Sequence, residues 1–347
     1  MRSVTQTWPG LLGRLVASED LSTDDTSWAM DQIMTGEATG AQIGAFVTAL
    51  RSKGETPAEV AGMAAVMLSH ARRVTLDKPA ADVVGTGGDQ SGTVNISTMS
   101  ALVTAAAGVP VVKHGNRGAS SRCGAADVLE SLGVVIDLPP AGVEACVREI
   151  GIGFCFAPVF HPAFRHAGPA RKEIGIPTVF NLMGPLTNPA QPASALVGCA
   201  HRGLAPVVAE VLASRGFSVL VVHGDDGLDE ITTTTTTTAW VTSGGTVRET
   251  SIDPAALDVP LTTAASLKGG DAATNAAVLR SLIAGETGPV RDTVLLNAAG
   301  AIAAFRGFST DLTADLRAGL EAAAEAVDSG RAAKLLDRWI TISKDLA

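Results

Sequence analysis

Short runs of β-branched residues alternate with alanine-rich segments of helical length from Asp82 onwards. The strand candidates lie at 82–84, 109–112, 134–136, 152–156, 195–197 and 218–222. Strands that are separated by about 10 to 15 residues of helical pattern form βαβ units, and such units build parallel sheets. The sequence therefore predicts an α/β fold with a mostly parallel central sheet flanked by helices. In folds of this kind, ligands bind beyond the carboxyl ends of the strands.

Residues 1–75 contain no strand candidate and are predicted to be helical throughout. Apolar residues recur at helical spacing on one face, at Ile43, Phe46, Val47 and Leu50. The sequence TPAE at 56–59 supplies an N-cap, a proline at the first helical position and a glutamate that completes a capping box. We therefore predict a small all-helical N-terminal domain over 1–75 and an α/β domain over 76–347. Within the latter, the threonine run 232–238 is predicted to be a structural strand, and the chain beyond Asp271 is predicted to be helical.

The composition excludes several classes of protein. Of the 347 residues, 46% are hydrophobic and 18% are charged, which excludes a disordered chain. The net charge of -9 argues against general nucleic-acid binding, which needs many cations. No apolar run reaches the roughly 18 to 20 residues of a membrane span, and the N-terminal residues lack a secretory signal pattern. The four cysteines form no CxxC pair, so we expect a protein of the reducing cytoplasm.

A glycine-rich motif, GTGGD at 85–89, directly follows the first strand candidate. Thr93, Asn95, Ser97 and Thr98 then open a predicted helix. Glycines let backbone N–H groups surround an anion, and a helix N-terminus adds unpaired donors, so this segment predicts a phosphate-binding loop. A tight turn followed by an N-cap is the alternative interpretation. The motif is neither a Walker sequence nor a Rossmann fingerprint.

A second motif, KHGNRGASSR at 113–122, stands where the next strand candidate ends. It holds three cations, one imidazole and two hydroxyls without an acid. In an acidic protein, such a cluster is a candidate positive wall for a polyanionic ligand. The alternative is a solvated loop.

A third motif, HGDDGLDE at 223–230, follows a further strand candidate. Consecutive carboxylates are hard oxygen ligands that suit Mg²⁺, although acidic turns without a metal are common. Together the three motifs indicate phosphoryl or phosphoribosyl chemistry. Because kinase loops and the Walker lysine are missing, phosphoribosyl chemistry is favoured.

These residues resemble the anthranilate phosphoribosyltransferase family. The matching stretches are GTGGD with NIST, KHGNRGASSRCGAADVLESLG, FAPVFHPAFRHAGPARKEIG, TVFNLMGPLTNP, HGDDGLDE, GGDAATNAAVLRSLIAG and LLNAAGA, and their order also agrees over nearly the whole chain. The resemblance implies a fold like that of nucleoside phosphorylases and phosphoribosyltransferases, in which helices near 165–190 complete the small domain and two subunits form a homodimer. The implied reaction moves the 5-phosphoribosyl group from phosphoribosyl diphosphate to the amine of anthranilate, with diphosphate as the leaving group, in tryptophan biosynthesis.

The resemblance also implies roles for individual residues. The residues carried over for phosphoribosyl diphosphate are Gly85, Gly88, Asp89, Thr93, Asn95, Ile96, Ser97, Thr98, Lys113, His114, Gly115, Asn116, Arg117, Gly118, Ala119, Ser120, Ser121 and Ala125. Those for anthranilate are Gly85, Asn116 and Arg171, and those for two Mg²⁺ ions are Ser97, Asp229 and Glu230. Lys113, His114 and Arg171 are the catalytic candidates, for a displacement of dissociative character. Ala125 departs from the Ser or Gly that is frequent in the family, which puts a hydroxyl contact there in doubt.

Three alternatives stay open at this point. The first is a pyrimidine nucleoside phosphorylase of similar fold, and the second is a non-catalytic relative that binds nucleic acid. The third keeps the chemistry but uses another aromatic amine as the acceptor.

Overall fold

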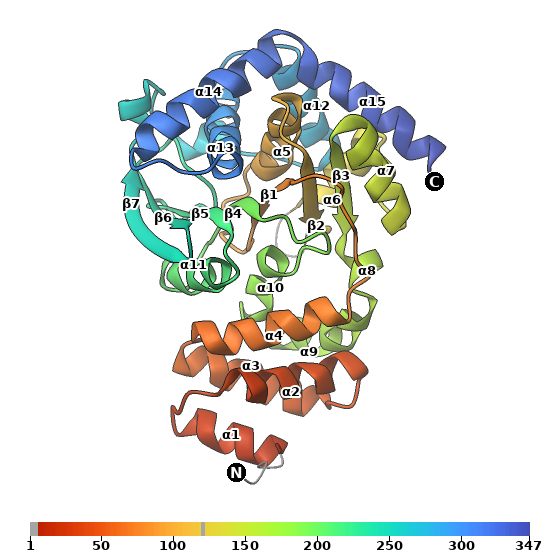
Figure 1. Cartoon of the computed structure of the whole chain (residues 1–347), viewed down its shortest axis with the longest axis vertical. Helices are drawn as coiled ribbons and strands as arrows, with labels where there is room; N and C mark the ends of the chain where they lie inside the picture. The colour runs from red at the N-terminus through yellow and green to blue at the C-terminus, as the bar shows by residue number, and fades with distance from the viewer. Residues whose placement is uncertain (1–5, 119–121) are drawn as a thin grey trace.

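The protein is described here by a computed structural model that covers residues 6–118 and 122–347. The described chain begins with four helices, namely α1 (Trp8–Val16), α2 (Thr23–Thr35), α3 (Gly40–Lys53) and α4 (Pro57–Ser69) (Figure 1). The predicted capping box at Thr56 is present, because the Thr56 side chain accepts a hydrogen bond from the Glu59 N–H and Glu59 accepts one from the Thr56 N–H. The predicted apolar stripe of α3 is buried. Local sequence therefore determines where these helices begin and which face they bury.

One seven-stranded sheet contains all the strands of the described residues. They are β1 (Ala81–Gly85), β2 (Val111–Gly115), β3 (Ile152–Phe156), β4 (Ser194–Gly198), β5 (Ser218–Gly224), β6 (Thr237–Ser243) and β7 (Thr246–Ile252), in the order β3-β2-β1-β4-β5-β6-β7. Strands β1 to β5 are parallel, whereas β6 and β7 are antiparallel. The mostly parallel sheet is confirmed. Since Gly85 pairs with Gly198 and Gly115 with Phe156, the carboxyl ends of neighbouring strands lie level.

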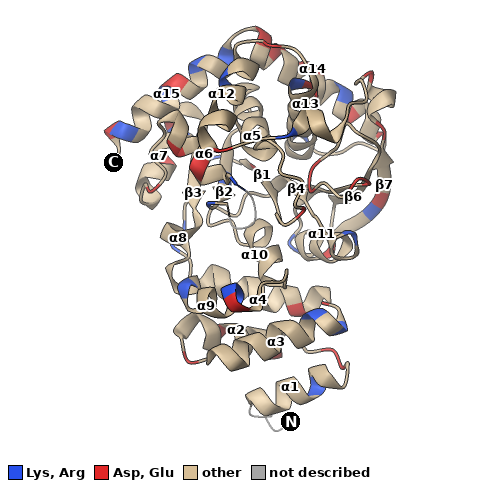
Figure 2. Ribbon diagram, turned by 180° about the vertical axis from the view of Figure 1, so that it is seen from behind, with Lys and Arg blue, Asp and Glu red and all other residues tan. Residues whose placement is uncertain are grey.

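Helices cover both faces of the sheet. They are α5 (Ile96–Ala106), α6 (Ala125–Leu132), α7 (Pro140–Ile150), α8 (Ala157–Phe160), α9 (Gly168–Ile174), α10 (Phe180–Leu186), α11 (Ala205–Ser214), α12 (Ala272–Ile283), α13 (Pro289–Arg306), α14 (Leu312–Asp328) and α15 (Arg331–Asp345), with short 3-10 helices at Pro162–Ala167, Arg202–Leu204, Pro254–Leu257 and Ala264–Leu267. Residues of both charge signs are spread along the outer helices (Figure 2). Among the described residues, none of these helices combines the length and hydropathy that a membrane span requires.

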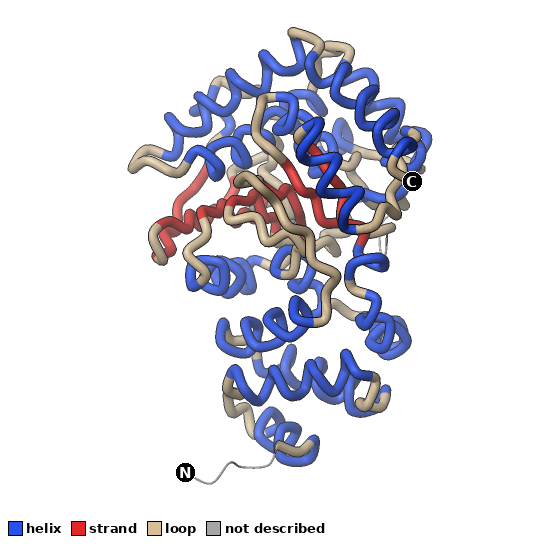
Figure 3. Tube along the Cα trace, turned by 45° about the vertical axis from the view of Figure 1, so that its right-hand side comes forward, coloured by secondary structure: helices blue, strands red, loops and turns tan. Residues whose placement is uncertain are grey.

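Alternate residues of the central strands are buried in two separate hydrophobic cores, one on each face of the sheet. Leu220 and Val222 of β5 join the core formed with α5, α13 and α14, whereas Val219 and Val221 join the core formed with α11 and the N-terminal helices. The strands thus form a layer between helices, with the N-terminal helices packed below one end (Figure 3). This two-faced burial is what a continuous apolar run in a parallel strand predicts.

Helices from the middle of the chain extend the N-terminal bundle. Ala170 of α9 and Phe180 of α10 are buried in the same core as Phe46 and Met63. Segments from within 165–190 therefore pack against the N-terminal helices, and that they complete the small domain stays a prediction. The boundary between 75 and 76 as a domain division stays a prediction.

One strand prediction was wrong, and another was right only for Thr237 and Thr238, which lie in β6. Residues 134–136 belong to no strand of the described chain. Val134 and Ile136 are buried, Val135 is partly buried, and the Val135 N–H donates to Ser343 Oγ at 3.0 Å. The threonine run is irregular until Thr237. The hydroxyls of Thr232 and Thr234 donate to the Asp226 carboxylate. Those of Thr236 and Thr238 donate to the Asp225 carboxylate. These hydroxyls hold an acidic turn, which β-propensity alone does not reveal.

Candidate active site

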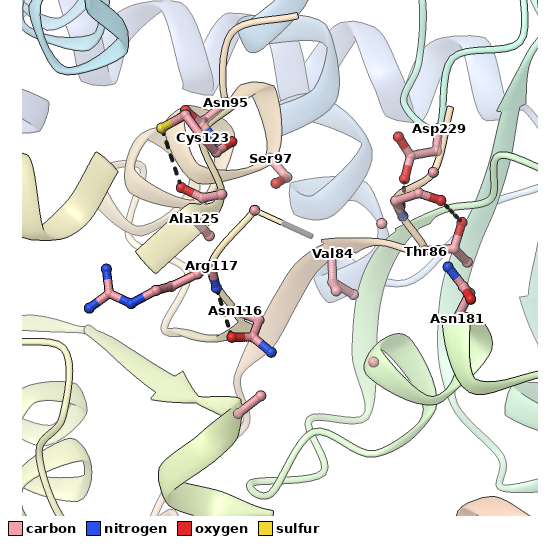
Figure 4. A pocket seen from close by; sticks show the side chains of 18 of the residues that line it. Val84, Thr86, Asn95, Ser97, Asn116, Arg117, Cys123, Ala125, Asn181 and Asp229 are labelled. Carbon is pink, nitrogen blue, oxygen red and sulfur yellow. Dashed lines mark hydrogen bonds between the residues drawn. The ribbon is translucent and has the colours of Figure 1, made fainter. Parts of the chain in front are cut away.

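A cavity of about 1370 Å³ opens at the carboxyl ends of β1 and β2. Its wall joins the loops after these strands to the segment between α8 and α10, which packs on the N-terminal helices. Figure 4 shows side chains from both sides of this cavity. The topology therefore brings the glycine loop, the cationic loop and the end of the acidic loop to one place, as the strand order predicts.

The glycine loop bends around a carboxylate. Gly87 and Gly88 have φ values of +65° and +88°, a left-handed conformation that glycine adopts without strain. The Gly87 N–H donates to Asp229 Oδ2 at 2.7 Å (Figure 4). A Cβ at position 85 would lie 2.3 Å from the same oxygen, so only glycine fits there. The first and third motifs are thus locked together.

The start of α5 closes the other end of the glycine loop. Asn95 precedes the helix, and its Nδ2 donates to the Cys123 carbonyl at 3.0 Å, so its side chain ties this loop to the cationic loop. Ile96 and Ser97 line the cavity. Thr98 does not: it is 2% exposed and faces the interior. Its assignment to the donor site stays a prediction.

Three carboxylates converge beside the glycine loop. In the part of the chain that the structure describes, Asp89, Asp229 and Glu230 bring one oxygen each within 4.8 Å of one another. Burial raises the pKa of Asp229 and Glu230, and the neighbouring negative charges raise both further. Glu230 Oε2 is enclosed without a hydrogen-bond partner. A cluster of hard oxygens with an unsatisfied lone pair fits Mg²⁺, which would relieve the repulsion.

Ser97 and Lys113 lie next to this cluster. The Lys113 ammonium donates to the Val83 carbonyl at 2.5 Å and to Ser97 Oγ at 3.2 Å. Burial lowers the pKa of Lys113, and the nearby carboxylates oppose that effect. Asp89 was predicted as a donor contact only, and the structure adds it to the acidic cluster. Asp225 and Asp226 are not part of this cluster, because their carboxylates accept hydrogen bonds from threonine hydroxyls.

His114 and His161 form a neutral pair in the cavity wall. Their ring centroids are 5.1 Å apart. His114 Nδ1 lies 2.9 Å from the Gly184 carbonyl, which fixes the proton on that nitrogen and leaves Nε2 as an unpartnered acceptor. Burial lowers the pKa of His114 to about 4 and that of His161 to about 3. Both imidazoles are therefore uncharged at neutral pH. His161 lies in the quoted stretch FAPVFHPAFRHAGPARKEIG, but its contact with His114 could not be predicted from the sequence.

The cationic loop carries less free charge than its sequence indicates. Arg117 forms ion pairs with Asp127 at 2.9 Å and with Glu130 at 2.8 Å, and it points away from Asp229 in Figure 4. The Gly118 N–H also donates to Asp127. The motif itself holds no acid, but α6 supplies two that pair with Arg117, and its contact with the donor stays a prediction. Ala119, Ser120 and Ser121 lie outside the described residues.

The rest of the loop keeps its place in the wall. Gly115, Asn116 and Ala125 line the cavity together with Thr93. Asn116 Oδ1 accepts a hydrogen bond from the Arg117 N–H at 2.8 Å. Ala125 presents a methyl group at the start of α6, so no side-chain hydroxyl is available at that point.

Arg171 lines the opposite side of the cavity from α9. Its guanidinium has no ion pair within the described residues, and burial lowers its pKa. An arginine never loses its charge in a protein, so this cation lacks a counter-ion. Cavity residues that the sequence analysis left without a role include Phe164, Arg165, Asn181 and Lys268. All but Lys268 lie in quoted motifs, so the motifs themselves were the available signal.

The histidine pair predicts a pH dependence of stability. Both pKa values are about 6.5 in the unfolded chain and lower in the folded one, so the unfolded state binds more protons below pH 6.5. Stability is complete above pH 6.5 and falls as the pH drops toward 4, by up to about 1.4 kcal/mol per pH unit for each proton. His161→Phe should reduce this slope in urea unfolding measured at pH 7, 6 and 5. An unchanged slope would contradict the assignment.

Known families match both parts of the chain. Residues 9–71 match the glycosyl transferase family, helical bundle domain, and residues 77–333 match the glycosyl transferase family, a/b domain. The anthranilate phosphoribosyltransferase of Saccharopolyspora erythraea is 65% identical over 346 residues, covering 100% of this chain and 99% of that protein.

Solved structures agree with this relationship. The anthranilate phosphoribosyltransferase of Thermus thermophilus has a TM-score of 0.89 and 39% identity, covering 96% of this chain and 99% of that one. The Saccharomyces cerevisiae anthranilate phosphoribosyltransferase in complex with PRPP and Mg has a TM-score of 0.88 and 26% identity, covering 97% of this chain and 98% of that one. The full-length match at high identity, on the fold and motifs described above, establishes that this chain belongs to the anthranilate phosphoribosyltransferase family of glycosyltransferases.

Proposed function

We propose that the protein transfers the 5-phosphoribosyl group from phosphoribosyl diphosphate to the amine of anthranilate, giving N-(5-phosphoribosyl)anthranilate and diphosphate in tryptophan biosynthesis. One observation carries the proposal: a single cavity joins a glycine loop and converging carboxylates to an arginine that has no counter-ion among the described residues. The first two features suit a diphosphate with its metal. The third suits the carboxylate of an aromatic acid.

The donor binds along the glycine loop and the start of α5. The segment from Gly88 to Ser97 lines the cavity where the diphosphate would lie, and Asp89, Thr93 and Asn95 belong to this wall. The Lys113 ammonium stands beside the acidic cluster and offsets negative charge that grows on the leaving group. The reaction needs no covalent intermediate, because electrostatic stabilisation of the departing diphosphate drives it.

Asp229 and Glu230 hold Mg²⁺, with Asp89 and Ser97 within the same region of the cavity. When bound, Mg²⁺ neutralises phosphoryl oxygens and so favours departure of the diphosphate. The enclosed Glu230 Oε2 gives this ion a ready ligand. The yeast relative was solved in complex with PRPP and Mg, which supports the assignment, and two ions per subunit remain our proposal.

Anthranilate lies between Arg171 and the donor. The Arg171 guanidinium pairs with its carboxylate through two parallel hydrogen bonds, and Asn116 contacts it near Gly85. His114 lines the same cavity, and we assign it a role in orienting the acceptor. Its low pKa keeps the imidazole uncharged at neutral pH.

Two further properties belong to the same proposal. The protein is a homodimer that associates through the helical bundle, as the family resemblance implies. It acts in the cytoplasm, and the burial of all four cysteines is in keeping with a reducing compartment. Family membership favours the transferase over a pyrimidine nucleoside phosphorylase or a nucleic-acid-binding protein.

Product analysis tests the proposed reaction. The enzyme is incubated with phosphoribosyl diphosphate, Mg²⁺ and either anthranilate or aniline, and ³¹P NMR follows diphosphate release. We expect release in step with anthranilate consumption and far less with aniline, which has no carboxylate for Arg171. Equal rates with both amines would contradict the acceptor assignment, and release without any acceptor would indicate hydrolysis instead.

A further inference from the structure

A segment from the far end of the sequence pairs with the glycine loop. The Val94 N–H donates to the Leu267 carbonyl at 3.0 Å, and the Gly269 N–H donates to the Gly92 carbonyl at 2.9 Å. Thr93 and Lys268 form an antiparallel bridge between them. Leu267 to Gly270, hereafter the clamp segment, is therefore hydrogen-bonded along the phosphate-binding loop.

The sequence of the clamp segment fits this one position. A Cβ at Gly269 would lie 2.6 Å from the Thr93 carbonyl oxygen, so only glycine permits the pairing. The Gly270 N–H donates to Asn275 Oδ1 at 2.8 Å, and Asn275 Nδ2 donates to Asn95 Oδ1 at 2.8 Å. Asn275 is 1% exposed. These contacts give a structural reason for the GGDAATN motif, and they fix the backbone of Lys268 beside the loop.

Lys268 presents an ammonium group to the cavity. Its Nζ donates to the Ser91 carbonyl, and no carboxylate of the described chain lies within ion-pair distance of it. Two other cations of this wall are engaged elsewhere. Arg117 is paired with two acids, and Lys113 is 2% exposed and bonded to Val83. Lys268 is exposed, so its positive charge is available to a ligand on the glycine loop.

We propose that Lys268 is a further substrate-binding residue, which pairs its ammonium with the diphosphate group of the donor. The inference rests on the proposed function and extends it to a residue outside the three recognised motifs. The clamp segment holds the lysine backbone in place, so the ammonium stays within reach of a ligand on the glycine loop. A lysine acts here as a point charge, which suits a diphosphate bound at variable angles.

Binding of two half-ligands tests this role separately from turnover. Calorimetry measures the Kd of pyrophosphate with Mg²⁺ and the Kd of ribose 5-phosphate for the wild type, Lys268→Gln and Lys268→Arg. We expect Lys268→Gln to weaken pyrophosphate binding by about tenfold or more and ribose 5-phosphate binding by less than about twofold. Lys268→Arg should retain most of the affinity because it keeps the charge.

Matched controls separate charge from structure. Lys334→Gln removes an exposed lysine of α15 and should bind both ligands as the wild type does. Lys268→Met keeps the length of the side chain without its charge and should behave like Lys268→Gln. Both neutral Lys268 variants should keep the wild-type Tm and the KM for anthranilate, while the KM for phosphoribosyl diphosphate rises.

Three results would overturn the inference. The first is an unchanged affinity for pyrophosphate in Lys268→Gln. The second is an equal loss of affinity for pyrophosphate and ribose 5-phosphate. The third is a lowered Tm in both neutral variants that accounts for their loss of affinity. Failure of the proposed function is distinguishable from these. A wild type that forms no product from anthranilate, yet loses pyrophosphate affinity in Lys268→Gln, would refute the proposed acceptor while retaining the diphosphate contact.

Discussion

Glu230→Gln should lower kcat by about a hundredfold or more at any Mg²⁺ concentration near the wild-type optimum. The amide removes one negative ligand from the cluster with Asp89 and Asp229, so the metal binds more weakly and the leaving group is less well stabilised. Raising Mg²⁺ should restore part of the activity. Initial rates measured over a Mg²⁺ titration give both the apparent metal affinity and the limiting rate.

The same variant should be more stable than the wild type when no metal is present. Burial and negative neighbours raise the pKa of Glu230, which means that its charged form destabilises the folded state, and a neutral amide removes that cost. Thermal unfolding in EDTA measures the difference. Glu210→Gln, on the exposed side of α11, is the matched control and should change neither property. A Mg²⁺ dependence identical to that of the wild type would remove Glu230 from the metal site.

Arg171→Ala should raise the KM for anthranilate by about 30-fold or more and leave the affinity for phosphoribosyl diphosphate within about twofold. The guanidinium lines the acceptor side of the cavity without a counter-ion from the described chain, so its removal deprives the carboxylate of a bidentate partner. Arg171→Lys should be intermediate because it keeps the charge and loses the fork. Steady-state kinetics with each substrate varied in turn measure both effects.

The acceptor provides an internal control for this prediction. Aniline lacks the carboxylate, so the wild type and Arg171→Ala should use it at similar low rates. Arg148→Ala, on the exposed side of α7, should leave all constants unchanged. Comparable losses for donor and acceptor would refute the acceptor role of Arg171.

The sequence predicted those features that depend on local pattern. Helix caps such as Thr56 and the glycine loop after β1 are encoded within a few residues, and each is found where the pattern indicates. The parallel sheet followed from the alternation of strands and helices. Residues 134–136 show the limit of this reasoning, because an apolar β-branched run is equally suited to a loop that packs on the core without a strand partner.

The parts of the site that were missed depend on contacts between distant segments. Arg117 forms ion pairs with Asp127 and Glu130, which lie on the next helix. Sequence spacing alone does not show that a loop arginine reaches these two acids. Lys268 donates to the Ser91 carbonyl from a distant part of the sequence. Asp89 joins the acidic cluster only because Gly85 has no side chain and lets Asp229 approach. Long-range approach of this kind requires the fold.

The most direct test of the account is the fluorescence of anthranilate after the enzyme is mixed with phosphoribosyl diphosphate, with Mg²⁺ or with EDTA. A reaction without the donor serves as the baseline. We expect a decay that needs the donor and Mg²⁺ together and that is almost abolished in Glu230→Gln. A folded enzyme that leaves the fluorescence constant with both present would contradict it, as would an equal decay in EDTA.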